Sequence, residues 1–157
     1  MAKKTIAVRL GEQAKIPCRE HFYEFDENDL SGLHAAEALG RSPEEVFKTL
    51  VARGAKTGIN VFCIPVCCEL DLKKAAKAAG DKNMELIHVK ELRALTGYIR
   101  GGCSPVGMKK KYPTYFDETA ERYDTIAGSA GERGHQMEVE PMALINLVDG
   151  VLADLTT

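Results

Sequence analysis

The segment Ile59-Asn60-Val61-Phe62-Cys63-Ile64-Pro65-Val66 decides the fold class, because it is an apolar run rich in β-branched and aromatic residues. A run of this length and composition is typical of a strand. Residues 71–79 follow shortly after it, with an acidic start, a body of alanines and lysines, and Gly80 as terminator. These features favour a helix. The centre of the chain therefore mixes strand and helix.

The remaining segments predict the same alternation outward from this centre. We expect helices over residues 5–15, 30–39, 90–95 and 142–147, and strands over residues 18–25, 84–87, 112–116, 123–127 and 135–139. Ser42-Pro43-Glu44-Glu45 has the N-cap, the first-turn proline and the capping-box glutamate of a helix start, which predicts a further helix to about Arg53. The order predicts one α+β domain over residues 1–157, with a mixed sheet, curled or barrel-like, flanked by helices.

Composition sets the broad class. A chain of 157 residues is long enough for one domain with a core, and its 45% apolar and 28% charged residues exclude a disordered chain. No apolar run reaches membrane-spanning length, and the N-terminus leads into an amphipathic stretch instead of a signal-peptide core. We expect a cytoplasmic protein without a membrane partner.

The five cysteines indicate a reduced protein without a metal site. They are Cys18, Cys63, Cys67, Cys68 and Cys103, an odd number in which the adjacent pair is poorly placed to form a bridge. The spacing of Cys63, Cys67 and Cys68 lacks a second pair of ligands, so small buried side chains are the simpler interpretation. We predict no metal and no cofactor.

The net charge of −2 argues against tight binding of nucleic acid by the chain alone, because such binding grows with the number of neutralised phosphates. Two local basic patches remain candidates. One is Lys73-Lys74-Lys77 and the other is Lys109-Lys110-Lys111. Either is also compatible with an ordinary solvated face.

Two glycine-rich segments are candidates for binding a carbonyl or phosphate oxygen. Gly101-Gly102-Cys103-Ser104-Pro105-Val106-Gly107 offers backbone N–H groups without Cβ obstruction, although a tight turn explains it equally. Ser129-Ala130-Gly131-Glu132-Arg133-Gly134 is either a hairpin connection or a second set of donors, with Ser129 and Gln136 as hydrogen-bonding side chains. Neither segment is a Walker loop or a dinucleotide fingerprint, which disfavours nucleotide hydrolysis.

Lys48 lies within the apolar stretch Val46-Phe47-Lys48-Thr49-Leu50-Val51 of the helix predicted from Ser42. Its structural interpretation is an ion pair with Glu44 one turn earlier, or a stem that covers apolar surface. Its functional interpretation is an ammonium at a pocket wall that donates to a carbonyl or phosphate. Spacing alone favours the structural role. Tyr23 and Phe25 share one face of a predicted strand, where they line a pocket or pack in the core.

Taken together, these motifs resemble the YbaK/EbsC family, and most closely its Cys-tRNA(Pro) deacylase branch. The resemblance rests on four segments in the family's order: residues 46–50, residues 64–74, Gly97-Tyr98 with residues 101–107, and residues 129–134. It covers nearly the whole chain. It implies a single α+β domain like the editing domain inserted in bacterial prolyl-tRNA synthetases, acting in trans on mischarged tRNA.

The resemblance also implies a site. Lys48 corresponds to the family's functional lysine, near the terminal adenosine and the ester, and Gly101 and Gly102 supply backbone contacts near the scissile carbonyl. The implied substrate-binding residues are Tyr23, Phe25, Thr49, Ser104, Ser129, Gly131 and Gln136. Some relatives carry an aspartate where this chain has Gln136, and a glutamine cannot act as a general base at neutral pH.

The activity implied by the resemblance is deacylation of Cys-tRNA(Pro), in which the thiol of the substrate attacks its own carbonyl to give a thiolactone, or an oriented water attacks instead. The implied partners are the acceptor end of mischarged tRNA(Pro) and prolyl-tRNA synthetase, and the oligomeric state stays open between monomer and dimer. Two alternatives remain. One is a deacylase for alanyl or another small aminoacyl-tRNA, and the other is a non-catalytic module that binds the tRNA acceptor end or a synthetase.

Overall fold

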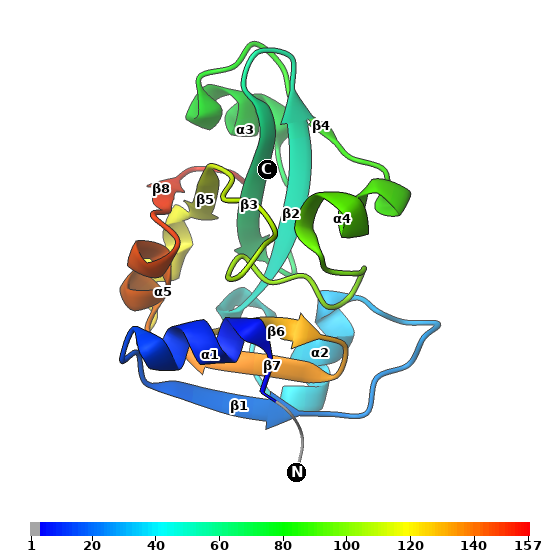
Figure 1. Cartoon of the computed structure of the whole chain (residues 1–157), viewed down its shortest axis with the longest axis vertical. Helices are drawn as coiled ribbons and strands as arrows, with labels where there is room; N and C mark the ends of the chain where they lie inside the picture. The colour runs from blue at the N-terminus through cyan, green and yellow to red at the C-terminus, as the bar shows by residue number, and fades with distance from the viewer. Residues whose placement is uncertain (1–3) are drawn as a thin grey trace.

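One mixed sheet of eight strands organises the computed structural model, which describes residues 4–157 (Figure 1). Its strands are β1 (Cys18–Phe22), β2 (Val46–Gly54), β3 (Gly58–Pro65), β4 (Glu85–Leu86), β5 (Thr114–Asp117), β6 (Ile126–Glu132), β7 (His135–Val139) and β8 (Val151–Ala153). The order is β1-β7-β6-β2-β3-β5-β8, and β4 pairs with β2 outside this path. The sheet curls without closing into a barrel. The expected α+β class is confirmed.

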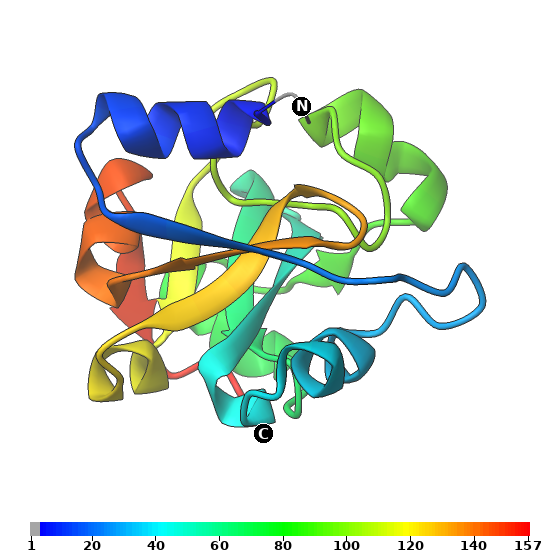
Figure 2. The ribbon, with the colours of Figure 1, turned by 90° about the horizontal axis from the view of Figure 1, so that it is seen from below.

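Five α-helices surround the sheet: α1 (Ile6–Gln13), α2 (Gly32–Leu39), α3 (Leu72–Ala79), α4 (Val89–Thr96) and α5 (Pro141–Leu147). Two 3-10 turns, η1 (Pro43–Glu45) and η2 (Glu118–Arg122), complete the described elements. The local signals that predicted α3 are in place, since the Asp71 carboxylate accepts hydrogen bonds from the first-turn N–H groups and Gly80 ends the helix at a φ of 72°. Figures 1 and 2 both show α1 running beside the β6–β7 hairpin.

The helix expected from Ser42 to about Arg53 is wrong. Only η1 forms there, without a side-chain cap from Ser42, and the chain continues directly into β2. β2 pairs in antiparallel register with β3 from Phe47 to Gly54. Its side chains also alternate between two cores, since Phe47 and Val51 lie in one apolar cluster while Ala52 lies in another. Burial on both faces with period two overrides the capping signal.

Two further elements differ from the expectation. β6 begins at Ile126 and continues through Ser129 to Glu132, so most of the second glycine-rich segment is strand, with a bulge between Ser129 and Glu132. Only Arg133 and Gly134 remain as the turn of the hairpin. The short strand β8 was not expected at all.

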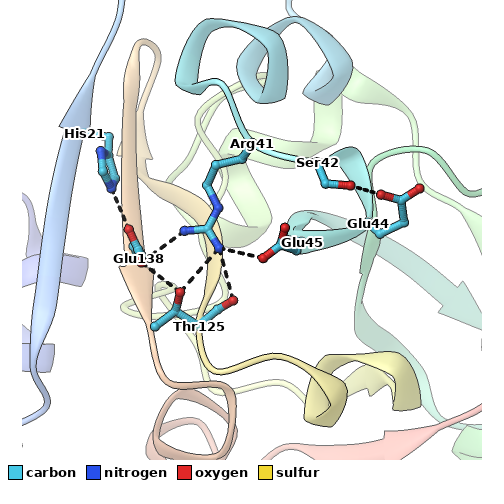
Figure 3. A network of polar contacts seen from close by, with 7 residues as sticks. All are labelled: His21, Arg41, Ser42, Glu44, Glu45, Thr125 and Glu138. Atoms are coloured by element: carbon cyan, nitrogen blue, oxygen red, sulfur yellow. Dashed lines mark hydrogen bonds and ion pairs between the residues drawn. The ribbon is translucent and has the colours of Figure 1, made fainter.

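A polar network joins the end of α2 to the β6–β7 hairpin (Figure 3). The Glu138 carboxylate accepts from His21 Nε2 at 2.8 Å and Thr125 Oγ1 at 2.7 Å, and it pairs with the Arg41 guanidinium at 3.0 Å. Arg41 also reaches Glu45 at 3.1 Å. Burial alone would raise the pKa of Glu138, but these donors lower it to about 2. The network thus fixes the segment that leads into β2.

Among residues 4–157, no helix is both long enough and apolar enough to cross a membrane.

Candidate functional site

A break in the pairing of β2 opens a cavity in the sheet. On one edge, β2 pairs with β3 from Phe47 to Gly54, but on the other edge it pairs with β6 only at Val46 and Phe47 and with β4 only at Ala52 and Arg53. Within the described part of the chain, residues 48–51 therefore have no strand partner on that edge, apart from one hydrogen bond from Ile87 N–H to the Val51 carbonyl. A cavity of about 590 Å³ lies beside them.

Segments far apart in the sequence line this cavity. They are residues 23–35 in part, residues 46–51, residues 66–69, residues 86–92 in part, and Arg100, Gly101, Cys103, Ser129 and Gln136. A volume of this size lies within the range typical of small-molecule sites. It is therefore large enough to hold a small organic ligand.

Lys48 is a half-buried cation in the cavity wall. It lies in the middle of β2, so the expected alternative of an ion pair with Glu44 along a helix does not form. Within residues 4–157, its ammonium makes no ion pair and no hydrogen bond. Burial raises the pKa of the nearby Cys68 thiol, and the charge of Lys48 opposes this rise. An ammonium with unused donors at a cavity wall is available to an anion or a carbonyl oxygen.

The turn at Gly101 and Gly102 packs directly against the β6–β7 hairpin. The Gly102 N–H donates to the Ile99 carbonyl at 2.9 Å, so it serves its own turn. A Cβ at Gly102 would lie 3.0 Å from Glu132 Cα, which explains the need for glycine here. Gly101 has a φ of 84° and lines the cavity, and its N–H has no acceptor among residues 4–157. Gly101 is therefore the donor that this turn leaves available.

Two hydrogen-bonding side chains come from the hairpin itself. Ser129 lines the cavity, and its Oγ accepts from the Gly131 N–H at 3.1 Å. Gln136 is buried at the same wall, and its Oε1 has no hydrogen-bond partner within the described residues. Burial raises the pKa of the neighbouring Tyr23 phenol, while the Gln136 amide lowers it. A buried acceptor without a partner costs free energy unless a ligand satisfies it.

The cavity thus brings together six of the residues expected from sequence: Tyr23, Lys48, Thr49, Gly101, Ser129 and Gln136. The other four lie outside its lining. Gly102 supports the turn, Gly131 packs against Tyr98, Phe25 is 43% exposed beside Gly134, and Ser104 is fully buried with its Oγ accepting from Val106 N–H. Ser104 borders a second, much smaller cavity of about 20 Å³.

Five further polar residues of the lining were not among the site residues expected from sequence, namely Ser31, Cys67, Cys68, Glu69 and Arg100. Cys67 and Glu69 follow β3 and only come near Lys48 because β3 pairs with β2. Glu69 is the one carboxylate of the lining, and no histidine takes part in it. Burial raises the pKa of Cys103 to about 12, so this thiol is protonated at neutral pH. The cavity therefore offers oriented donors without a Ser–His or Cys–His pair.

A family model matches most of this chain. Residues 32–147 match the aminoacyl-tRNA editing domain, and this range includes every cavity residue from α2 to Gln136. The chain belongs to the aminoacyl-tRNA editing domain family. The family membership expected from the sequence motifs is confirmed.

The chain is similar to three known proteins. It is 51% identical over 155 residues to the protein named "Putative Cys-tRNA(Pro)/Cys-tRNA(Cys) deacylase EbsC" of Enterococcus faecalis, a match that covers 99% of this chain and 94% of the relative. It is 33% identical over 108 residues to the proline--tRNA ligase of Shouchella clausii, covering 68% of this chain and 19% of the ligase. A crystal structure described as "a putative trans-editing enzyme for prolyl tRNA synthetase" superposes with a TM-score of 0.82 at 26% identity, over 99% of both chains.

Proposed function

We propose that this editing domain deacylates mischarged Cys-tRNA(Pro) in trans, in the cytoplasm. The observation that carries the proposal is the single cavity that combines the unpartnered Lys48 ammonium with Gly101 and Ser129. The relative that is 51% identical over nearly the whole of both chains is named as a deacylase of Cys-tRNA(Pro) and Cys-tRNA(Cys), which supports the choice of substrate.

The lining residues take distinct roles in the proposal. Lys48 binds near the terminal adenosine and the ester, where its ammonium donates to an oxygen. The Gly101 N–H donates to the carbonyl oxygen as negative charge develops on it, and one well-placed donor of this kind is worth about 3 kcal/mol. The Gln136 Oε1 accepts from the α-ammonium of the aminoacyl group, because it is a buried acceptor without another partner.

The nucleophile is the thiol of the substrate. Its proton leaves the sulfur, the sulfur bonds to the carbonyl carbon, the bond from that carbon to the ribose oxygen breaks, and the ribose oxygen takes up a proton. The products are a cyclic thiolactone and uncharged tRNA. The cavity holds no histidine and its Cys103 thiol is protonated, so binding that keeps the substrate thiol near the carbonyl supplies the main rate effect.

The partners follow from the same substrate. The acceptor end of tRNA(Pro) enters the cavity, and prolyl-tRNA synthetase supplies the mischarged tRNA. The similarity to a segment that makes up 19% of a proline--tRNA ligase supports this pairing, because it indicates that one fold serves both as part of a synthetase and as a separate chain.

A panel of tRNA(Pro) charged with cysteine, alanine, serine or proline tests the proposal. We expect rapid release of cysteine and much slower release of alanine, which differs from cysteine by the missing sulfur. Rapid release of alanine with slow release of cysteine would instead indicate a deacylase for small apolar residues. No release from any of the four would overturn the enzyme and favour a binding module.

A further inference from the structure

Two segments of the chain that border the cavity carry charges of opposite sign. Residues 88–111 contain six lysines and arginines and a single glutamate, although the whole chain has a net charge of −2. Residues 24–29 contain four carboxylates and no cation. The first segment comprises α4 and the glycine-rich turn, and the second is the connection between β1 and α2. The two segments thus carry strong charge of opposite sign.

Both segments border the same cavity. Val89, Leu92 and Arg100 line it from the basic segment. Tyr23 and Leu30, which lie at the two ends of the acidic connection, line it from the other. Both views place α4 and the β1–α2 connection on the same side of the molecule, on the right, but apart from each other (Figures 1 and 2). A ligand that leaves the cavity therefore meets cations on one side and carboxylates on the other.

Most cations of the basic segment have no acidic partner. Glu91 pairs with Arg53 at 2.9 Å, and Lys111 pairs with Asp149. The remaining five form what we term the α4 face: Lys90, Arg93, Arg100, Lys109 and Lys110. Each is exposed, and none makes an ion pair with another group of residues 4–157.

Hydrogen bonds to backbone carbonyls hold the lysine run and Arg100 of the α4 face next to α4 and the hairpin. The Lys109 N–H donates to the Thr96 carbonyl at 3.0 Å, and the Lys109 side chain lies against Gly97, so the lysine run begins at the C-terminal end of α4. Arg133 from the hairpin donates its Nε–H to the Arg100 carbonyl at 2.9 Å, which brings one more cation to this side. Cations from three segments therefore gather next to the cavity.

We propose that the α4 face binds backbone phosphates of the tRNA acceptor end and so sets the direction from which the aminoacyl ester enters the cavity. This inference rests on the proposed function. The tRNA backbone carries negative charge on every nucleotide, so it is attracted to the α4 face and repelled by residues 24–29. The other basic patch, Lys73-Lys74-Lys77 on α3, contributes no residue to the cavity, and Lys74 is paired with Asp154 at 3.0 Å.

A triple variant tests the α4 face. Lys90→Gln, Arg93→Gln and Lys110→Gln remove three cations from exposed positions outside the cavity lining. If each binds one phosphate, the dependence of log affinity on log salt becomes shallower by about 2 to 3, and affinity at low salt falls at least tenfold. We would measure the affinity for uncharged tRNA(Pro) by filter binding between 50 and 200 mM salt, and the single-turnover rate at saturating enzyme.

The matched control removes the same charge elsewhere. Lys73→Gln, Lys77→Gln and Lys82→Gln change exposed residues of α3 and the turn after it, all outside the cavity lining. We expect at least tenfold weaker tRNA binding at low salt in the α4 variant, and less than a twofold change in binding in the control. Equal loss in both variants, or no loss in either, would overturn the α4 face. Because binding of uncharged tRNA is measured without catalysis, failure of the wild type to release cysteine would overturn the proposed function separately.

Discussion

The contact between the glycine turn and the hairpin predicts a specific effect of Gly102→Ala. Gly102 does not have a positive φ, so alanine is compatible with its backbone, but the added Cβ would lie 3.0 Å from Glu132 Cα and 3.1 Å from Arg133 N. Carbon contacts are most favourable at about 3.5–4.0 Å. These neighbours are backbone atoms that cannot rotate away, so the turn and the hairpin must separate by about 0.5–1 Å.

Gly102→Ala should lower both the stability of the protein and its rate of deacylation. Overpacking of this kind costs about 1–3 kcal/mol, which corresponds to a Tm lower by about 2–12 °C for a domain of this size. The separation also moves Gly101 relative to Ser129, and a misplacement of about 1 Å lowers an enzymatic rate by about 100-fold. Thermal unfolding and single-turnover deacylation of Cys-tRNA(Pro) measure the two effects on the same preparation.

Gly128→Ala provides the control within the same hairpin. A Cβ at Gly128 meets only the Phe47 carbonyl oxygen, at 3.5 Å, which is an ordinary contact. We expect this variant to unfold and react like the wild type. If Gly102→Ala behaved like Gly128→Ala in both assays, the packing of the glycine turn against the hairpin could not be what positions the site.

Three further predictions concern individual side chains. The wild type should be more stable than Glu138→Gln by on the order of 3 kcal/mol at pH 7, because the folded state lowers the pKa of Glu138. This difference should vanish as the pH falls from about 4.5 to about 2. Denaturant unfolding across this range measures it, and a difference that stays constant with pH would contradict the prediction. Iodoacetamide at pH 8 should label the exposed Cys67 before the buried Cys103, because burial raises the pKa of Cys103 to about 12. Peptide mass spectrometry measures the labelling of each cysteine, and equal labelling would show that Cys103 is accessible. Gln136→Leu should slow deacylation about 10- to 100-fold with unchanged stability, because it removes the hydrogen bond to the substrate ammonium, and a hydrogen bond to a charged group is worth about 1.5–3 kcal/mol. A variant that reacts at the wild-type rate would show that Gln136 is not part of the site.

Caps and apolar runs in the sequence correctly predicted the elements that depend mainly on neighbouring residues. The Asp71 cap and the Gly80 terminator bound α3 as expected, and the apolar run around Phe62 is a central strand. The capping signal at Ser42 failed, because pairing with β3 and burial on both faces turn the following residues into β2. The placement of Lys48 on a helix failed with it.

The cavity itself could not be predicted from local patterns. It exists because β2 leaves β6 after Phe47 and meets β4 only at Ala52 and Arg53, and these pairings join segments that lie far apart in the chain. The resemblance to the family nevertheless supplied six residues of the lining. It also supplied Gly102 and Ser104, whose hydrogen bonds serve the turns in which they lie.

The most direct test of the central claim is the single-turnover release of cysteine from Cys-tRNA(Pro) by the wild type and by Lys48→Ala, with circular dichroism on both proteins. We expect the wild type to release cysteine, and the variant to keep its fold but react about 100- to 1,000-fold more slowly because one oriented donor is lost. A folded Lys48→Ala protein that reacts at the wild-type rate, or one that unfolds, would contradict the assignment of Lys48 to the site.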